Sequence, residues 1–225
     1  MLLIIILTVK TDLSFFNDKA SGCDKIINEY IKCTVHDLMP MYVKLFNLVL
    51  DTGIVPELWS LGIMIPIFKN KGSKADPANY RGVTLNSCLG KTLSSIINER
   101  LNSFSDEVEL ISESQAGFRK GFSTTDNIFV LQSILTIFFS MGKKLFCTFV
   151  DFKRAFDTVW RTGLWQKLQK SHITGKIFTV IYNMYQNIKT CVRYGNQSST
   201  FFNCGVGVRQ GENLSPFLFS VFLND

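Results

Sequence analysis

The carboxylate of Asp151 is the clearest candidate for catalytic chemistry in this chain, because of the residues that precede it. Residues 145–150 read Leu-Phe-Cys-Thr-Phe-Val, a nearly continuous apolar run that predicts a short buried strand. A lone carboxylate at the end of a core strand is costly unless it is paired or bound to a cation. Divalent-metal binding is therefore one role for Asp151. The other is the N-cap of the helix predicted after it, which this stretch by itself slightly favours.

Two basic loops have the composition of phosphate-binding sites. Residues 69–74 read Lys-Asn-Lys-Gly-Ser-Lys at a predicted hairpin tip. Arg119 and Lys120 lie near two glycines, just before a Ser/Thr cluster that caps a predicted helix. Anions bind readily at such helix N-termini. A solvated polar loop is the commoner explanation for the first run and an equal one for the second.

A glycine-rich loop at residues 205–211 precedes the last predicted helix. Its glycines allow a backbone or a flat ligand to approach closely, although an ordinary strand-to-helix turn explains them too. Ser215 is expected to cap the helix that follows, with Pro216 at its first position.

Apolar periodicity predicts the elements that must position these residues. Pro66 indicates that the first strand is at an edge or a bulge, and Gly195-Asn196 indicates a hairpin turn. Expected helices begin near residue 26 and cover 38–49, 89–104, 128–138, 155–168 and 177–185, with another after 216; expected strands cover 63–68, 82–85, 190–194 and 200–204.

The composition is that of a globular protein of 225 residues, with 46% hydrophobic and 19% charged residues. The net charge of +6 permits a polyanionic partner without demanding one. Six cysteines without C-x-x-C spacing and two histidines argue against a zinc site and for a reducing, intracellular compartment. The apolar first ten residues are too short to span a membrane and lack the pattern of a secretion signal.

Taken in order, these motifs resemble the reverse transcriptase domain of non-LTR (LINE-type) retrotransposons. The resemblance covers residues 20–225 and leaves residues 1–19 as an unassigned extension. Six ordered blocks within one chain are hard to obtain by chance. They are Ala-Ser-Gly-Cys-Asp at 20–24; Ile-Pro-Ile-Phe-Lys at 65–69 and Asp-Pro-Ala-Asn-Tyr-Arg-Gly-Val-Thr-Leu at 76–85; Leu-Gly-Lys at 89–91; Gly-Phe-Arg-Lys-Gly-Phe-Ser-Thr at 117–124; Phe-Val-Asp-Phe-Lys-Arg-Ala-Phe-Asp at 149–157; and Gly-Val-Arg-Gln-Gly-Glu-Asn-Leu-Ser-Pro at 207–216.

The resemblance implies an α+β fold, the fingers and partial palm of a right-hand polymerase, with a ferredoxin-like antiparallel palm sheet backed by helices. It implies that Asp151 is a catalytic carboxylate and the first ligand of a site for two Mg²⁺ ions, whereas Asp157 caps or orients. It implies RNA template, DNA primer and deoxynucleoside triphosphates as partners, and no membrane. The implied nucleotide-binding residues are Arg81 and Lys69 at the triphosphate, Phe156 beside the sugar 2′-carbon, and Gln210 and Gly211 beside the base, with Arg119 near template or nucleotide.

The chain departs from the family in one important respect. It has no adjacent Asp-Asp pair and ends at Asp225, before the position of the family's aromatic-Ala-Asp-Asp hairpin. The isolated chain is therefore expected to be an inactive polymerase fragment, with a non-catalytic nucleic-acid-binding remnant as the alternative. A nuclease using Asp151 and Asp157 is disfavoured, because an intervening helical turn would point them apart. Poor solubility is also expected, from an exposed apolar face on the last helix.

Overall fold

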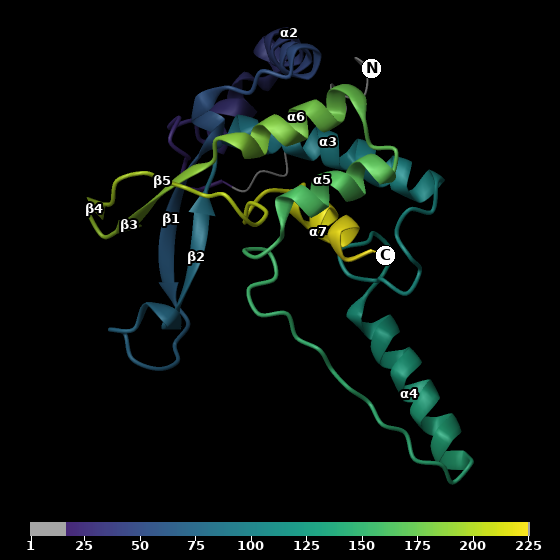
Figure 1. Cartoon of the computed structure of the whole chain (residues 1–225). Coiled ribbons are helices and arrows are strands. Elements are labelled where there is room, and N and C mark those ends of the chain that lie inside the picture. The colour runs from purple at the N-terminus through teal and green to yellow at the C-terminus, as the bar shows by residue number, and fades with distance from the viewer. Residues whose placement is uncertain (1–16, 225) are drawn as a thin grey trace.

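A five-stranded mixed sheet lies at the centre of the computed structural model, which describes residues 17–224 (Figure 1). The first sixteen residues, most of the predicted extension, lie outside the described part. The strands are β1 (Leu61–Phe68), β2 (Tyr80–Leu85), β3 (Lys189–Tyr194), β4 (Gln197–Ser198) and β5 (Phe202–Asn203), in the order β2-β1-β3-β4 with β5 also paired to β3. The expected mixture of helices and strands is thus confirmed.

Strand β1 pairs antiparallel with β2 but parallel with β3, so the sheet is not wholly antiparallel as the resemblance implied. Pairing with β2 continues to Phe68, whereas pairing with β3 stops at Met64. Pro66 therefore lies where β1 has a neighbour on one side only. Proline has no N–H to donate, which is why it is tolerated at this edge, as predicted.

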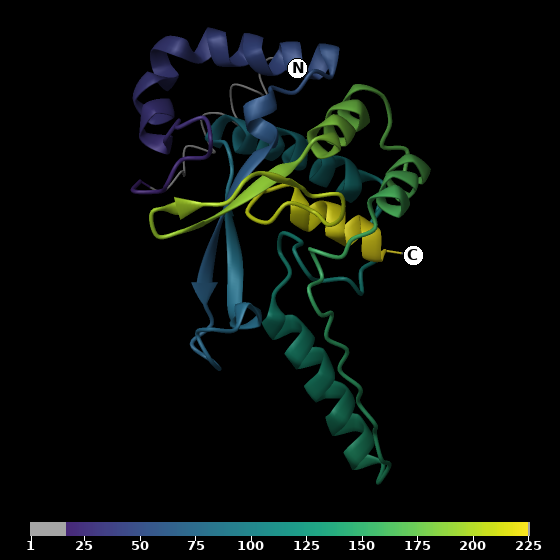
Figure 2. The same ribbon diagram turned by 60° about the vertical axis from the view of Figure 1, so that its left-hand side comes forward.

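Helices surround the upper part of the sheet, while the β1–β2 hairpin and one helix extend away from it (Figures 1 and 2). Helices α3, α5, α6 and α7 carry residues of the main apolar core, together with part of α2. The helices are α2 (Asn28–Thr52), α3 (Cys88–Glu107), α4 (Thr124–Ser140), α5 (Arg161–Lys170), α6 (Gly175–Gln186) and α7 (Ser215–Leu223), with short 3₁₀ turns η2 (Glu57–Ser60) and η3 (Pro77–Asn79).

The two helices expected near the N-terminus are one continuous helix, α2. Pro40 lies inside it, and the helix is bent in Figure 2, as expected where a proline removes a backbone hydrogen bond. The sequence predicts an apolar face that includes Leu38 and Met41, which is partly wrong, because these two residues are exposed while Val35 and Val43 are buried. It also predicts a helix end near Gly53, which is confirmed: Gly53 terminates the helix in a left-handed conformation with φ of 71°.

The last helix is packed, contrary to the expectation of an exposed apolar face. Phe217, Leu218 and Val221 on α7 are all buried, and Phe222 is half-buried against the same core. Helix α7 begins at Ser215 with Leu214 at the N-cap, so the predicted capping position was one residue late.

Exposed apolar surface is found instead on a projecting arm, residues 123–152, which comprises α4 and the chain that returns beside it (Figures 1 and 2). The predicted strand at 145–150 is wrong: the segment forms no strand, and Phe146 and Phe149 are 89% and 83% exposed. Residues 144–152 donate or accept no backbone hydrogen bond with the described residues. A β-rich sequence becomes a strand only when a neighbouring strand satisfies its backbone groups.

The predicted cap of α4 is confirmed, although its predicted core face is not. Ser123 accepts a hydrogen bond from the backbone N–H of Asp126 and the Asp126 carboxylate accepts one from Ser123, which together form a capping box. No residue of α4 is buried. The helix predicted over 155–168 is also shorter than expected, since residues 153–158 form turns and α5 begins at Arg161.

A buried polar cluster fastens the loop at residues 205–214 to the sheet. Arg209 Nη1 lies 2.7 Å from Glu212 Oε1, and both side chains are almost fully buried. Arg209 Nη2 also donates to the carbonyl of Trp59 at 2.8 Å and to Asn86 Oδ1 at 3.1 Å. The Asn86 amide in turn donates to the carbonyl of Gln210 at 3.2 Å. These contacts join η2, the end of β2 and the loop.

The arm generates the first prediction. Replacing both Phe146 and Phe149 with serine should reduce self-association, while the free energy of unfolding changes by no more than about 0.5 kcal/mol, as is usual for surface sites. Leu218→Ala in the core should instead cost about 2–5 kcal/mol. Light scattering and urea unfolding measure the two quantities. A loss of stability in the serine variant as large as that of Leu218→Ala would mean that the arm is packed.

The buried ion pair generates the second prediction. Arg209→Met leaves the Glu212 carboxylate buried without its partner and should cost about 3–5 kcal/mol, whereas adding Glu212→Leu should recover much of this loss. Urea unfolding of the single and double variants measures the difference. Equal stability of the two variants would argue against the pairing.

The same variant should respond to pH in a defined direction. Burial raises the pKa of Glu212 above its ordinary value, and Arg209 opposes this rise. A raised pKa in the folded protein gives stability that is present below the unfolded pKa and lost as pH rises through the folded value. The cost of Arg209→Met should therefore be smaller at about pH 5 than at about pH 8.

Candidate functional site

The turn that follows the arm and the glycine-rich loop lie against each other. Val208 N donates to the carbonyl of Phe156 at 2.8 Å, and Gly207 N donates to the carbonyl of Val159 at 2.9 Å. A Cβ at Gly207 would lie 2.7 Å from the carbonyl oxygen of Asp157, and its φ is +80°. The close backbone approach expected of this loop is therefore confirmed at Gly207, where only glycine fits.

Gln210 and Asp157 are joined directly by their side chains. The Gln210 amide Nε2 donates to Asp157 Oδ1 at 2.7 Å. The two residues are 53 positions apart in the chain, and both belong to the motifs singled out in the sequence. This contact fits an orienting role for Asp157, since its carboxylate holds the side chain that extends from the loop.

Phe156 forms the aromatic wall of the site. Its ring stacks on Phe219 of α7, with centroids 4.9 Å apart and planes 19° apart, and meets the edge of Phe118 at 5.8 Å. Offset stacking and edge contacts of this kind are favourable and fix the plane of the ring.

Three of the predicted nucleotide-binding residues line one shallow pocket of about 490 Å³. They are Phe156, Gln210 and Gly211, and the rest of the lining comes from Arg209, Glu212, Asn213, Ser215 and Pro216. A Cβ placed on Gly211 would lie 3.4 Å from the carbonyl oxygen of Thr84 in β2, so the loop comes close to the sheet at this point. The pocket combines an aromatic face, an amide and a glycine backbone, which suits a planar polar ligand.

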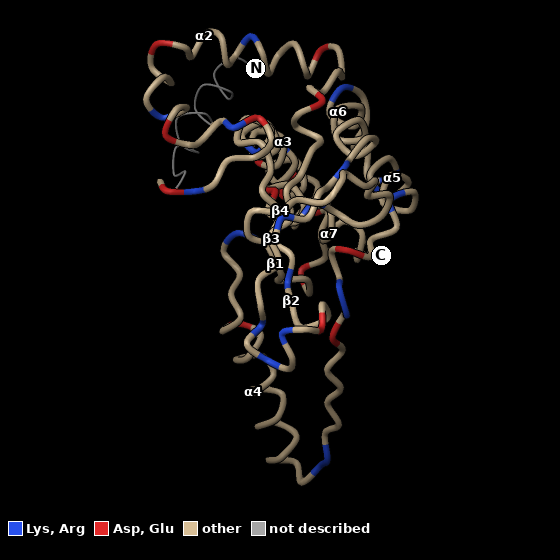
Figure 3. Tube along the Cα trace, turned by 90° about the vertical axis from the view of Figure 1, so that its left-hand side faces the viewer, with Lys and Arg blue, Asp and Glu red and all other residues tan. Residues whose placement is uncertain are grey.

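Arg81 and Lys69 lie outside this pocket, on the β1–β2 hairpin. Arg81 is exposed and faces Ile67 in the strand register, three residues along β2 from Thr84. The Lys69 ammonium donates to the carbonyl of Ala78 at 2.9 Å, which ties it to the hairpin loop. Figure 3 shows lysine and arginine positions at the end of this hairpin. The hairpin thus presents positive charge away from the helical body.

Asp151 is exposed and is the second-last residue of the arm, and it does not line the pocket. Within residues 17–224, no three or more His, Cys, Asp or Glu side chains gather in a group that could hold a metal ion. The first carboxylate of the motif is therefore separated from the part of the same motif, Phe156 and Asp157, that the structure brings to the loop.

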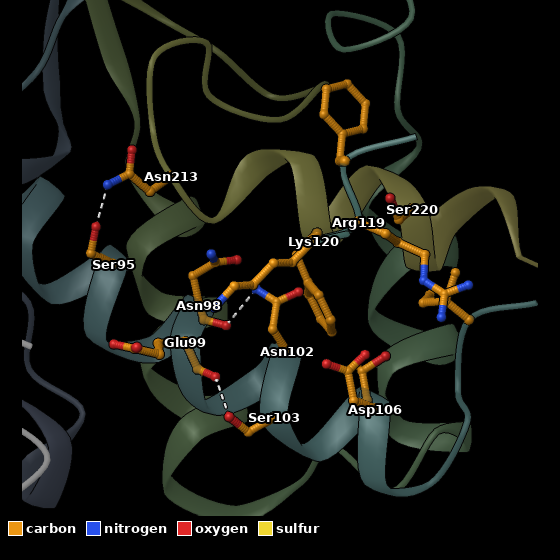
Figure 4. Close-up of a pocket in the computed structure, with 14 residues that line it drawn as sticks. Ser95, Asn98, Glu99, Asn102, Ser103, Asp106, Arg119, Lys120, Asn213 and Ser220 are labelled. Atoms are coloured by element: carbon orange, nitrogen blue, oxygen red, sulfur yellow. Dashed lines mark hydrogen bonds between the residues drawn. The ribbon is translucent and has the colours of Figure 1, made fainter. Parts of the chain in front are cut away.

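Arg119 lines a different, more polar pocket beside α3 and α7 (Figure 4). Its guanidinium donates to the carbonyl of Ser112 at 3.1 Å and lies 4.4 Å from the centroid of the Phe122 ring. These contacts hold Arg119 within its own loop.

Several supporting residues were missed in the sequence, above all Arg161 and Tyr185. Arg161 donates to the carbonyls of Gly207, Val206 and Tyr185 at 2.8–3.1 Å, and burial lowers its pKa. Burial raises the pKa of Tyr185 to about 12, with a smaller contribution from Glu212. Tyr185 lies in an apolar run of the sequence, which does not indicate a polar role. Arg161 belongs to none of the sequence motifs, so the sequence does not indicate its role either.

None of the helices in the described part is long and apolar enough to cross a membrane. The sequence predicts no membrane contact for the whole chain, whereas this finding covers residues 17–224 only.

Comparison with known proteins agrees with the motif order. The family model for reverse transcriptase (RNA-dependent DNA polymerase) matches residues 69–225. A probable RNA-directed DNA polymerase from transposon X-element of Drosophila melanogaster is 30% identical over 212 residues, covering 93% of this chain and 23% of the relative. The RNA-directed DNA polymerase from mobile element jockey of the same species is 29% identical, covering 92% of this chain and 22% of the relative.

A more distant relative belongs to another element. The Pol polyprotein from type-1 retrotransposable element R2 of Popillia japonica is 29% identical over 178 residues, covering 77% of this chain. The chain spans about a quarter of the length of the curated relatives it matches. The family match covers well over half of the chain and includes the arm, the turn and the loop described above. The chain therefore belongs to the reverse transcriptase family, and it matches that domain in the polymerases of non-LTR retrotransposons.

Proposed function

We propose that this chain forms the nucleotide-binding part of an RNA-directed DNA polymerase of a non-LTR retrotransposon and acts in template-directed nucleotidyl transfer. The pocket shared by Phe156, Gln210 and Gly211 supports this most directly, because it lies inside the span that the family model matches. An RNA template, a DNA primer and deoxynucleoside triphosphates are the partners that follow. Action inside the cell, in the nucleus, the cytoplasm or both, belongs to the same proposal.

In this proposal the pocket receives the sugar and base of the incoming nucleotide. Phe156 is held by Phe219 and Phe118, so its ring is a rigid wall. A sugar placed against that wall has little room for a 2′-hydroxyl, which favours deoxynucleotides. Gln210 and Gly211 lie on the side where a template base would pair.

The basic residues outside the pocket are assigned to the charged parts of the substrates. Arg81 and Lys69 attract the triphosphate from the β1–β2 hairpin, where their charges are exposed to solvent. Arg119 contacts template or nucleotide from its own loop. In fold terms, residues 20–225 form the fingers and part of the palm, and residues 1–19 form an extension.

The reverse transcriptase family generally uses divalent metal ions. We propose Asp151 as a catalytic carboxylate that binds Mg²⁺, but the described residues do not by themselves fit a two-ion site. Asp151 is exposed, and no group of potential ligands surrounds it in the part of the chain that the structure describes. Residues 17–224 therefore hold no preformed set of carboxylates that would complete the site. The isolated chain is accordingly expected not to extend an oligo-dT primer on poly-A RNA.

The role of Asp151 gives the third prediction. In a polypeptide that extends this chain to the length of its relatives, Asp151→Asn should lower primer extension by at least about 1,000-fold, or roughly 4 kcal/mol of activation free energy. Template affinity should stay within about twofold, because Asp151 is exposed. Asp37→Asn, another exposed aspartate, is the matched control.

Two outcomes would change this assignment. Synthesis that survives Asp151→Asn would exclude the catalytic role. A parent polypeptide that binds template but never extends a primer would favour the non-catalytic nucleic-acid-binding remnant.

Phe156 gives the fourth prediction. Phe156→Ala should raise the use of ribonucleotides relative to deoxynucleotides by about tenfold, equivalent to 1.4 kcal/mol, because the ring no longer crowds the 2′ position. Single-nucleotide incorporation by the longer polypeptide measures the ratio. Phe219→Leu is the control, since it removes the stacking partner without touching the pocket. If the control relaxes the ratio equally, Phe156 acts through packing and not through the sugar.

A further inference from the structure

A polar pocket of about 560 Å³ lies between α3, the loop at residues 111–120 and the start of α7 (Figure 4). It is separate from the pocket at Phe156, and the proposed function assigns it no ligand beyond the uncertain contact of Arg119. Its volume falls within the range of sites that bind small molecules or parts of larger ones.

Three side-chain amides line this pocket. Asn98 and Asn102 come from α3, and Asn213 comes from the glycine-rich loop. Each amide offers both donors and an acceptor, which is the combination that reads the edge of a nucleobase. Asn213 donates to the hydroxyl of Ser95, and Asn102 donates to the backbone carbonyl of Asn98 at 2.9 Å. The amides of Asn102 and Asn213 are therefore held by groups of α3.

Two oxygens at the wall lack hydrogen-bond partners among the described residues, Asn98 Oδ1 and Ser220 Oγ. A buried polar atom without a partner costs about 1–3 kcal/mol. Neighbouring atoms cover both oxygens. Rotation toward a donor in the pocket would recover this cost, which favours a ligand with N–H or O–H groups.

The charged residues of the lining are balanced. Arg119 and Lys120 supply two cations, and Glu99 and Asp106 supply two carboxylates. A triphosphate with several negative charges has no advantage in such a pocket. One phosphodiester beside a neutral base matches the balance better.

The pocket adjoins the candidate nucleotide site. Asn213 lines both pockets. Phe118, which is 61% exposed, lines the polar pocket and meets the ring of Phe156 at 5.8 Å. Exposed aromatic rings are stacking platforms for unpaired bases. A strand with one nucleotide in the polar pocket can therefore place its neighbour at Phe156 and Gln210.

We propose that this pocket binds one unpaired nucleotide of a single-stranded polynucleotide, with the base against the asparagine amides and Phe118 and the phosphodiester beside Lys120. The proposal extends the proposed function, since it adds a site for the strand next to the site for the incoming nucleotide. It does not depend on catalysis, so it can be tested with the isolated chain.

The test measures the affinity of the chain for a labelled single-stranded 12-mer of uridine by fluorescence anisotropy, at fixed salt. Asn98→Leu should weaken binding about tenfold, equivalent to 1.4 kcal/mol, and Lys120→Gln about threefold. Asn47→Leu and Lys170→Gln are the matched controls and should stay within about twofold. Asn47 is also a half-buried helical asparagine whose side-chain oxygen lacks a partner among residues 17–224, and Lys170 is an exposed lysine on α5.

Two further experiments can refute the proposal even if the Asn98→Leu variant unfolds. Photo-crosslinking of a 4-thiouridine 12-mer to the unmodified chain should label the peptide that contains Phe118, and labelling confined to other segments would overturn the proposal. Free uridine monophosphate should compete only at far higher concentration, whereas equal competition would make this a mononucleotide site. Unchanged affinity in Asn98→Leu and Lys120→Gln would refute the pocket while leaving primer extension, and so the proposed function, untouched.

Discussion

The buried ion pair between Arg209 and Glu212 is the interaction on which the candidate site depends. Arg209 reaches η2 through the Trp59 carbonyl and the end of β2 through Asn86, while Asn86 holds the carbonyl of Gln210. Burying such a pair is costly unless all of its hydrogen bonds are made. Arg209 makes several, but Glu212 Oε2 has no hydrogen-bond partner among the described residues. The pair therefore fixes the geometry of the loop more than it adds stability. Gln210 is half-buried and Gly211 is exposed, whereas Arg209 and Glu212 on either side of them are buried.

The elements with internal hydrogen bonds were the ones that the sequence predicted well. Helix α3, the β1–β2 hairpin and the turn at Gly195-Asn196 follow from local periodicity and turn chemistry. The strand at residues 145–150 was wrong for the opposite reason, since its composition favours a strand but the described sheet gives it no neighbour. Burial on α2 and α7 was also misjudged, because the face that a helix buries depends on partners far away in the chain.

The residues of the candidate site could be predicted from the sequence, but the hydrogen bonds between them could not. Motif order placed Phe156, Gln210 and Gly211 in one function, and the structure places them in one pocket. The hydrogen bond between Gln210 and Asp157 joins residues 53 positions apart, which no local pattern can foresee. Arg161 and Tyr185 lie in ordinary-looking helical sequence, yet Arg161 holds two carbonyls of the loop. Such residues are recognised only when the backbone groups that they satisfy are known.

The two halves of the motif at residues 149–157 differ in their backbone hydrogen bonding. Its second half is fixed by the loop, because backbone hydrogen bonds from Gly207 and Val208 reach the carbonyls of Val159 and Phe156. Its first half has no such partners among the described residues, and Asp151 lies in the exposed arm. The candidate nucleotide pocket is therefore formed within the described residues, whereas Asp151 lies in a segment without such backbone partners. Under the proposed function, nucleotide binding at the pocket and catalysis by Asp151 would then be separable.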